Sequence, residues 1–237
     1  MVDGVEHNYM TQPLMNQPLI TSITTPFLFH IPVNCYLLAG EDGFILIDTG
    51  MPRQRRQIEQ ALIQKGCSSR NLRLIILTHG DIDHCGNAAY FRQTFQAEIA
   101  MHRDDCGMVE FGDMFWNRRK PNFFLRWAVG RFFSLSKSDR FQPDLLLEEG
   151  DRFSEYGVAA EVVYLPGHSR GSIGILTGIG DLFCGDLFEN LKEPGCSIIN
   201  DAVAENASIH KLNNLPINRV YPGHGKPFQY SQLSIAN

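Results

Sequence analysis

The sequence has little of what marks several large classes of protein. Its formal net charge is −5 at pH 7, so it lacks the basic excess that nucleic-acid binders usually show. No stretch approaches the roughly 20 consecutive apolar residues that a membrane span requires. The first residues, MVDGVEHNYM, lack the basic stretch and apolar run of a secretory signal. We therefore expect a cytoplasmic protein that does not bind nucleic acid and does not insert stably into a membrane.

Paired cysteines are also absent. The six cysteines are scattered from Cys35 to Cys196 and form no C-x-x-C pair, the spacing typical of zinc ribbons and thiol redox motifs. Free thiols in a reducing compartment explain this pattern better than a disulfide framework does.

The order of apolar and polar segments predicts an α/β protein with a single domain over residues 1–237. Hydrophobic residues make up 43% of the chain and charged residues 20%, which suits one large core. NCYLLAG and GFILIDTG read as a hairpin, LRLIILTH as a strand buried on both faces, and PRQRRQIEQALIQKG as a helix. Similar strand patterns in the second half end in polar loops. This arrangement predicts sheets covered by helices, with the chemistry at the strand ends.

Residues from 104 to about 145 break this rhythm. Nine aromatic residues, including both tryptophans, fall between residues 111 and 141, together with an excess of basic residues. Leu125, Val129 and Phe132 have helical spacing. We expect a helical aromatic insertion that forms a lid over a substrate pocket or a contact between the subunits of a homodimer. Contact with a membrane surface is the third alternative.

The stretch THGDIDHCG concentrates four side chains that can bind a metal. His79, Asp81, Asp83 and His84 directly follow the buried strand, so they are expected in a loop at its end. Imidazole and carboxylate groups together bind zinc, iron or manganese, and catalytic sites keep one position open for water.

Three further residues repeat this placement. His168 in LPGHSRGSIG, Asp186 in FCGDLF and His224 in YPGHG each lie in a glycine turn or at a strand end. Each residue alone is an ordinary turn residue. Their joint order favours a metal site assembled from several strand ends.

The motifs FILIDTG, THGDIDHCGN, LPGHSRGSIG, GDLF and YPGHG occur in an order and at spacings that resemble the metallo-β-lactamase superfamily. The resemblance implies an αββα sandwich with a two-metal site at one edge. It implies that one metal is bound by His79, Asp81 and His168, that the other is bound by Asp83, His84 and His224, and that Asp186 bridges the two. Asp48 matches the family's supporting aspartate, which orients a metal ligand.

Asp81 departs from the family pattern, because most members have histidine at this position. A carboxylate oxygen and the nearer imidazole nitrogen are both three bonds from Cα, so Asp81 can reach the same place. The flavodiiron relatives also carry a carboxylate here and hold iron. An oxygen ligand favours harder metals, and a third carboxylate makes the site less positive, so its bound water should deprotonate at higher pH. The alternative is that the substitution simply weakens the site.

The resemblance implies a hydrolase that uses a metal-bridging hydroxide on a small-molecule substrate such as an ester, thioester or lactone. The expected cofactors are two divalent metal ions, zinc or iron, with manganese as a third option. Asp83 and Asp186 are the candidate catalytic residues. Two other functions remain open: a di-iron redox enzyme similar to the flavodiiron group, and a non-catalytic protein that binds or senses a metal.

Overall fold

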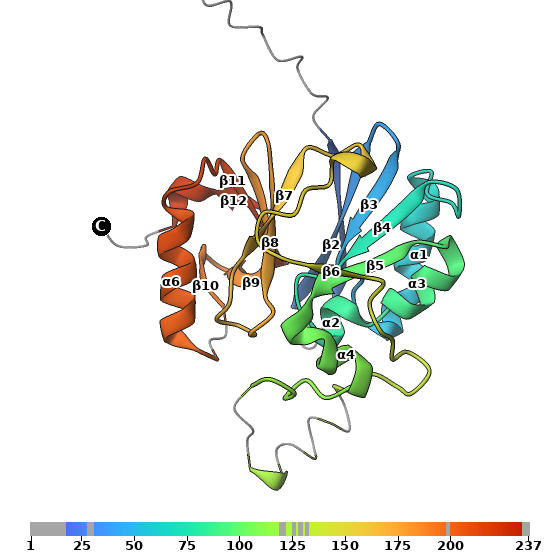
Figure 1. The fold of residues 1–237 in the computed structure, drawn as a ribbon, viewed down its shortest axis with the longest axis horizontal. Coiled ribbons are helices and arrows are strands. Elements are labelled where there is room, and N and C mark those ends of the chain that lie inside the picture. Colours follow the sequence, from blue (N-terminus) through green and yellow to red (C-terminus); the bar gives the residue numbers. More distant parts are fainter. Residues whose placement is uncertain are drawn as a thin grey trace, which may run out of the picture.

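Two sheets packed face to face, with helices on their outer sides, form the body of the molecule (Figure 1). The computed structural model describes residues 18–27, 31–118, 122–124, 127, 130, 133–197 and 200–233. The sandwich that the sequence predicts is confirmed in these residues.

The first sheet has six strands in the order of the sequence. They are β1 (Leu19–Pro26), β2 (Pro32–Gly40), β3 (Gly43–Ile47), β4 (Leu72–Ile76), β5 (Glu98–His102) and β6 (Leu145–Leu147). Strands β1 to β3 pair antiparallel, and β3 to β6 pair parallel. The predicted hairpin is β2 and β3, and the predicted buried strand is β4. Strand β1 was not predicted from the sequence.

The second sheet follows the path β12-β11-β9-β8-β7, with β10 paired to β9. Its strands are β7 (Ala160–Tyr164), β8 (Ile173–Thr177), β9 (Asp181–Asn190), β10 (Gly195–Cys196), β11 (Arg219–Gly225) and β12 (Phe228–Gln229). Strands β7, β8 and β9 pair antiparallel, and β9 and β11 pair parallel. Because β9 and β11 run in the same direction, their carboxyl ends lie at the same edge of the sheet.

The helices of the described residues are α1 (Arg55–Gln64), α2 (Ile82–Cys85), α3 (Ala88–Phe95), α4 (Cys106–Phe111) and α6 (Ala202–Leu212), with 3-10 turns at Pro52–Gln54, Arg103–Asp105, Ser154–Tyr156 and Tyr230–Gln232. Helix α1 lies in the stretch predicted to be helical, whereas Asp83 and His84, which were expected in a loop, lie on the short helix α2. Asp201 caps α6, since its carboxylate accepts hydrogen bonds from the Val203 and Ala204 amides, both at 3.1 Å. None of the helices in the described ranges is long and apolar enough to cross a membrane.

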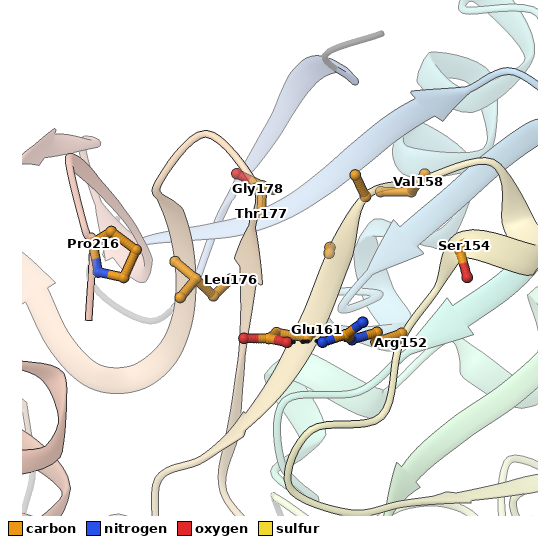
Figure 2. Close-up of a pocket in the computed structure, with 10 residues that line it drawn as sticks. Arg152, Ser154, Val158, Glu161, Leu176, Thr177, Gly178 and Pro216 are labelled. Carbon is orange, nitrogen blue, oxygen red and sulfur yellow. Dashed lines mark ion pairs between the residues drawn. The ribbon is translucent and has the colours of Figure 1, made fainter. Parts of the chain in front are cut away.

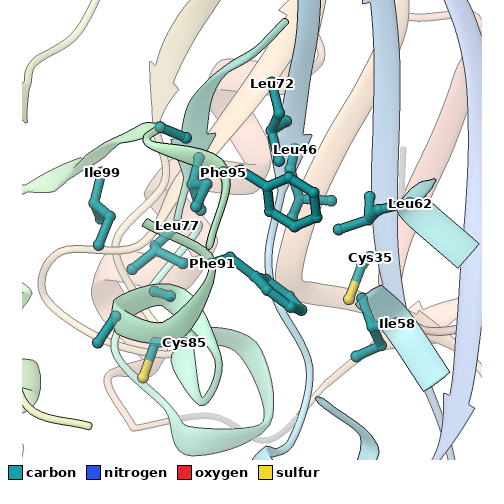
Figure 3. Close-up of a cluster of buried hydrophobic side chains, with 14 of the residues drawn as sticks. Cys35, Leu46, Ile58, Leu62, Leu72, Leu77, Cys85, Phe91, Phe95 and Ile99 are labelled. Carbon is teal, nitrogen blue, oxygen red and sulfur yellow. The ribbon is translucent and has the colours of Figure 1, made fainter. Parts of the chain in front are cut away.

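Alternate side chains of the first sheet enter two different core layers. Tyr36 and Leu38 of β2 pack between the two sheets, where they meet Phe183 and Tyr221 of the second sheet. Leu37 points to the other face of β2 and packs toward the helices. Figure 3 shows this outer layer, in which side chains of α1 and α3 cover the sheet. A third cluster packs the second sheet against α6. Strands β2 to β5 are therefore largely buried on both faces, as the continuous apolar runs predict, whereas β1 and β6 are partly exposed.

The inserted segment is described only in part. It contains α4 and a turn over residues 114–117, whereas residues 119–121, 125–126, 128–129 and 131–132 lie outside the described residues. The predicted helical face of Leu125, Val129 and Phe132 falls among the latter. Phe123, Phe124 and Trp127 are 76%, 79% and 64% exposed, and the expectation of a lid or a homodimer contact stays a prediction.

A large side chain at the centre of the outer core offers a test of this packing. Phe91 on α3 is fully buried, and Phe91→Ala leaves a cavity that the neighbouring strands cannot fill. We expect the free energy of unfolding to fall by about 3–5 kcal/mol, measured by denaturant titration. The exposed Phe123 is the matched control, and Phe123→Ala should change the stability by less than about 0.5 kcal/mol. An equal loss in both variants would contradict the assigned packing.

Candidate metal centre

The seven candidate ligands come from the ends of four strands and the loops that follow them. His79 lies just after β4, and Asp81, Asp83 and His84 lie on or next to the short helix α2. His168 follows β7, while Asp186 and His224 lie within β9 and β11. The fold brings all seven together where the two sheets meet, although the sequence separates them by up to 145 positions (from His79 to His224).

Six of these residues form two groups whose ligand atoms all lie within 4.8 Å of one another. The first group is His79, His168 and Asp186, and the second is Asp83, His84 and His224. Members of both groups are buried. Each group is compact enough to hold one metal ion, and the pairing matches the one that the resemblance implies, apart from Asp81.

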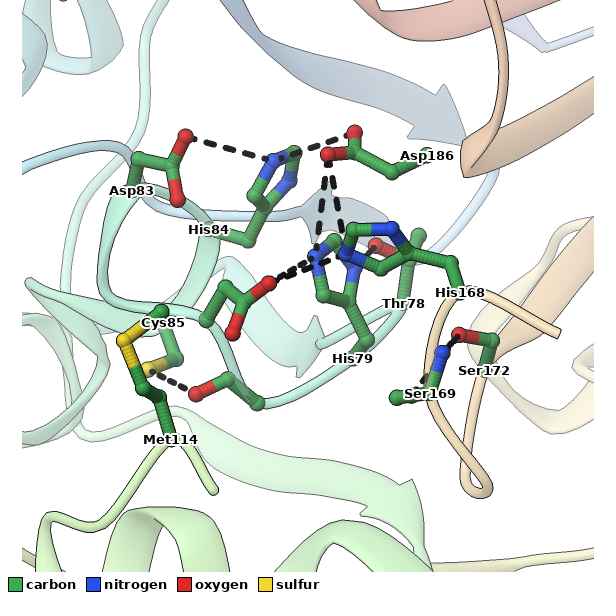
Figure 4. A network of polar contacts seen from close by, with 12 residues as sticks. Thr78, His79, Asp83, His84, Cys85, Met114, His168, Ser169, Ser172 and Asp186 are labelled. Atoms are coloured by element: carbon green, nitrogen blue, oxygen red, sulfur yellow. Dashed lines mark hydrogen bonds and ion pairs between the residues drawn. The ribbon is translucent and has the colours of Figure 1, made fainter. Parts of the chain in front are cut away.

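Asp186 lies between the two groups (Figure 4). Its Oδ1 atom is 3.3 Å from His84 Nε2, and its Oδ2 atom is 3.2 Å from His224 Nε2. Oδ2 is also 4.0 Å from His79 Nε2 and 3.9 Å from His168 Nε2. A single carboxylate therefore faces imidazoles of both groups, which is the placement expected of a bridging ligand.

The site contains polar atoms that a metal ion would satisfy. His79 Nε2, His84 Nε2 and Asp186 Oδ1 are buried and have no hydrogen-bond partner among the described residues. Buried polar atoms are normally paired, because leaving one unpaired costs about 1–3 kcal/mol. All three atoms are suitable ligand atoms and all three point into the site. The residues present therefore fit two metal ions.

Asp48 orients one side of the site from behind the ligands. Its Oδ2 atom is 2.9 Å from His84 Nδ1, and its two oxygens accept hydrogen bonds from the amide and hydroxyl of Thr78. The contact to Nδ1 leaves His84 Nε2 directed into the site. Asp48 also has a φ of 59°, a left-handed conformation that is rare for residues other than glycine. This confirms that Asp48 supports a candidate ligand.

Asp81 has a partner that the sequence did not indicate. Arg118, from the inserted segment, donates from Nη1 to Asp81 Oδ1 at 2.6 Å and from Nη2 to Oδ2 at 2.9 Å. The Arg118 and Asp81 side chains are only 5% and 9% exposed. Asp81 Oδ2 is also 2.9 Å from His168 Nε2 and 3.5 Å from His79 Nε2. Asp81 thus faces the first group and a buried cation at once.

Asp105 is a second feature that sequence analysis missed. This carboxylate is fully buried and accepts hydrogen bonds from the Gly80 amide, the Gly171 amide, the Ser169 hydroxyl and the Asn117 side chain. It ties together the loop of His79, the loop of His168 and the inserted segment. No motif surrounds Asp105, so the only available signal was its position at the start of the insertion.

A cavity of about 310 Å³ adjoins the first group. Its lining mixes polar and apolar surface and includes Asn117, Arg118, Arg170, Asn200 and Asp201. Another cavity of about 320 Å³ lies at the Gly178 end of β7 and β8, near Val158 and Leu176 (Figure 2). That end is opposite to the one from which His168 extends. Of these two cavities, the one beside His168 is the nearer to the candidate metal ligands.

Opposite charges shift the pKa values of the ligands away from their ordinary range. Burial alone would lower the pKa of His224, but the Asp186 carboxylate outweighs it and raises the pKa to about 9. The pKa of Asp186 is held well below its ordinary value, because His224 and His84 outweigh the effect of burial. Burial would also raise the pKa of Asp81, yet the charge of Arg118 holds it well below its usual range.

The shift of His224 predicts a pH dependence for metal-free protein. The pKa of about 9 in the folded state exceeds the value of about 6.5 expected in the unfolded chain. A raised pKa contributes stability that is fully present below pH 6.5 or so and is lost as the pH rises through about 9. We expect the free energy of unfolding of chelator-treated protein to fall across this window in denaturant titrations. His224→Gln should make the decline smaller, and a stability that increases over the window would contradict the assignment.

The hydrogen bonds of Asp105 predict a large effect of a small substitution. In Asp105→Asn, an NH2 group replaces one of the two carboxylate oxygens. This group cannot accept the hydrogen bonds that the oxygen accepts in the wild type, so at least one buried hydrogen bond is lost. We expect the variant to lose about 2–3 kcal/mol of stability. Asp104→Asn, at the neighbouring and more exposed carboxylate, is the control and should cost less than about 0.5 kcal/mol. Equal unfolding midpoints for the two variants would refute the role of Asp105.

Comparison with known proteins agrees with this geometry. The Haemophilus influenzae hydroxyacylglutathione hydrolase GloC is 29% identical over 150 residues, which cover 60% of this chain and 60% of that protein. The human acyl-coenzyme A thioesterase MBLAC2 is 26% identical over 226 residues, which cover 84% of this chain and 75% of that protein. A solved structure, the di-iron-bound form of TTHA1623, is 25% identical with a TM-score of 0.67, covering 92% of this chain and 98% of that one.

A family model that matches most of the chain establishes the family. The chain spans less than two thirds of the length of the first curated relatives, 64% in one case and 60% for GloC. A family model described as the metallo-beta-lactamase superfamily matches residues 29–224, which include Asp48 and all seven candidate ligands. The chain therefore belongs to the metallo-beta-lactamase superfamily.

Proposed function

We propose that the protein is a hydrolase that uses two divalent metal ions to cleave an ester, a thioester, a lactone or a related small acyl compound. The observation that carries the proposal is the pair of facing ligand groups with Asp186 between them. Two such groups suit a centre in which one water is activated and one carbonyl oxygen is polarised. The named relatives support hydrolysis at this general level.

The proposed ligand set is supported by the distances for six of its seven residues and adds Asp81 from the resemblance to the family. His79, Asp81 and His168 would hold one ion, Asp83, His84 and His224 would hold the other, and Asp186 would contact both. His224 Nδ1 lies 2.9 Å from the Pro32 carbonyl, and an N–H at Nδ1 leaves Nε2 without a proton and available as a ligand atom. His84 is oriented in the same way by Asp48.

The two ions together would supply an activated water and a Lewis acid for the substrate carbonyl. The contribution of the chain is to hold charges in place around the reacting atoms. Asp186 would fix the separation of the two ligand groups. Asp83 has the most exposed side chain among the carboxylates of the site, at 13%, and its Oδ2 atom is 3.5 Å from His224 Nε2. It is therefore the carboxylate best placed to accept a proton from the attacking water.

The substrate is proposed to carry a polar or anionic group next to its acyl centre. Arg170 is exposed to solvent in the cavity beside His168, which Arg118 also lines. The polar lining further includes Asn117, Asn200 and the carboxylate of Asp201. Such a lining favours carboxylate, phosphate or amide groups over a long apolar chain. The names of GloC and MBLAC2 refer to acyl compounds, which agrees with this class.

A second candidate is a di-iron redox enzyme. It is favoured by the carboxylate at position 81 and by the di-iron-bound neighbour TTHA1623. Under this alternative, purified protein would contain two iron ions and consume oxygen or nitric oxide in the presence of an electron donor. The same protein would not hydrolyse any acyl substrate.

Metal analysis of protein purified without chelator, followed by a screen of chromogenic esters, thioesters and lactones, tests the proposal. We expect two metal ions per chain and a hydrolysis that chelators abolish and added metal restores. Asp186→Asn should lower kcat/KM by at least about 100-fold and reduce the metal content, because the shared carboxylate is lost.

Asp181→Asn is the matched control for this variant. Asp181 begins the same strand, β9, at the end away from the ligands, so metal content and hydrolysis should be unchanged. Metal-free wild-type protein that hydrolyses the same substrates, or a wild type that never takes up metal, would overturn the proposal.

A further inference from the structure

We propose that Arg118 is the positioning and charge-compensating partner of Asp81, and that the two residues together replace the histidine that the family usually has at position 81. The proposal rests on the proposed two-metal function and deepens it. Asp81 alone would add a negative charge to the metal centre. Arg118 returns the charge of the centre to the value that a neutral histidine would give.

The contact between the two side chains is well suited to this role. Arg118 engages both oxygens of Asp81, at 2.6 Å and 2.9 Å, in a fork that fixes the plane of the carboxylate. With that plane fixed, Oδ2 lies beside the nitrogens of His168 and His79 that face the first site. A carboxylate oxygen has a second lone pair, so Oδ2 can accept from Arg118 and still bind a metal ion.

Arg118 is itself held in place by its neighbours. Its Nη1 atom contacts the Met114 carbonyl at 3.4 Å, within the same turn. The preceding residue, Asn117, donates to Asp105 at 2.6 Å, and Asp105 is anchored to the loops of His79 and His168. The guanidinium is therefore anchored on both sides and is not a mobile surface charge.

Burial makes the charge of Arg118 effective. An ion pair on the surface is screened by water, whereas here both side chains are less than one tenth exposed. A buried guanidinium whose carboxylate is removed becomes an uncompensated cation next to two divalent metal ions. Asp81→His restores the usual family ligand, but it should therefore bind metal poorly at the first site as long as Arg118 is present.

The experiment combines substitutions at the two positions and measures metal binding without reference to turnover. Metal content per chain and the affinity for zinc, from competition with a chromophoric chelator, are determined for wild type, Asp81→His, Arg118→Met and Asp81→His/Arg118→Met. We expect Asp81→His to weaken zinc binding at one of the two sites by at least about tenfold. Adding Arg118→Met to Asp81→His should restore two tightly bound ions per chain.

Two controls separate compensation from a general effect of charge or folding. Arg170→Met removes a neighbouring but exposed positive charge, and in combination with Asp81→His it should restore nothing. Arg118→Lys keeps the charge but loses the fork, so it should keep two ions per chain with a weaker affinity at the first site, and wild-type affinity would refute the positioning role. Denaturant titrations of the metal-free variants show whether each one is folded.

The outcomes distinguish this inference from the proposed function. Wild type could bind two ions while the addition of Arg118→Met fails to restore metal binding to Asp81→His. In that case charge compensation by Arg118 is wrong and the hydrolase proposal stands. If wild type holds one ion and Arg118→Met raises the content to two, Arg118 blocks the first site and the inference is overturned. If wild type holds none, the proposed function fails and the inference with it.

Discussion

Asp186 is a carboxylate buried where the two sheets meet, and burying such a group is costly unless positive charge compensates it. Two imidazoles lie within hydrogen-bonding reach of its oxygens and two more lie about 4 Å away. The parallel pairing of β9 and β11 places Asp186 and His224 at the same sheet edge, and the loop after β4 supplies the facing histidines. The sandwich therefore brings buried negative charge and buried imidazole together, in the arrangement on which the proposed two-metal centre rests.

Each buried carboxylate around the centre has a different partner and a different task. Asp48 is bonded to Thr78 and orients His84. Asp105 accepts four hydrogen bonds and joins three segments. Asp81 is paired with Arg118, whereas Asp186 has only the imidazoles. Since a carboxylate paired with arginine is compensated without a metal, Asp186 is the group whose charge most strongly requires the ions.

Sequence reasoning was most successful where a local pattern determines the structure. The apolar runs of β2, β3 and β4 are local signals, and the family motifs located the seven candidate ligands. Arg118 and Asp105 could not be found in this way, because no motif marks them and their decisive partners are distant in the chain. Asp81 is 37 positions from Arg118, and the partners of Asp105 other than Asn117 are at least 25 positions away. The net charge assigned to the site from the sequence was incomplete for the same reason, because it included the carboxylate of Asp81 but not the guanidinium of Arg118. The helical face predicted for Leu125, Val129 and Phe132 stays a prediction, because these residues lie outside the described part of the chain.

Anomalous diffraction from crystals of protein purified without chelator tests the central claim most directly, because it locates metal ions independently of any assay. The account predicts two anomalous peaks per chain, one contacted by His79, Asp81 and His168 and the other by Asp83, His84 and His224, with Asp186 touching both and Arg118 still bonded to Asp81. A single peak, or two peaks with Asp186 turned away from either of them, would contradict the account.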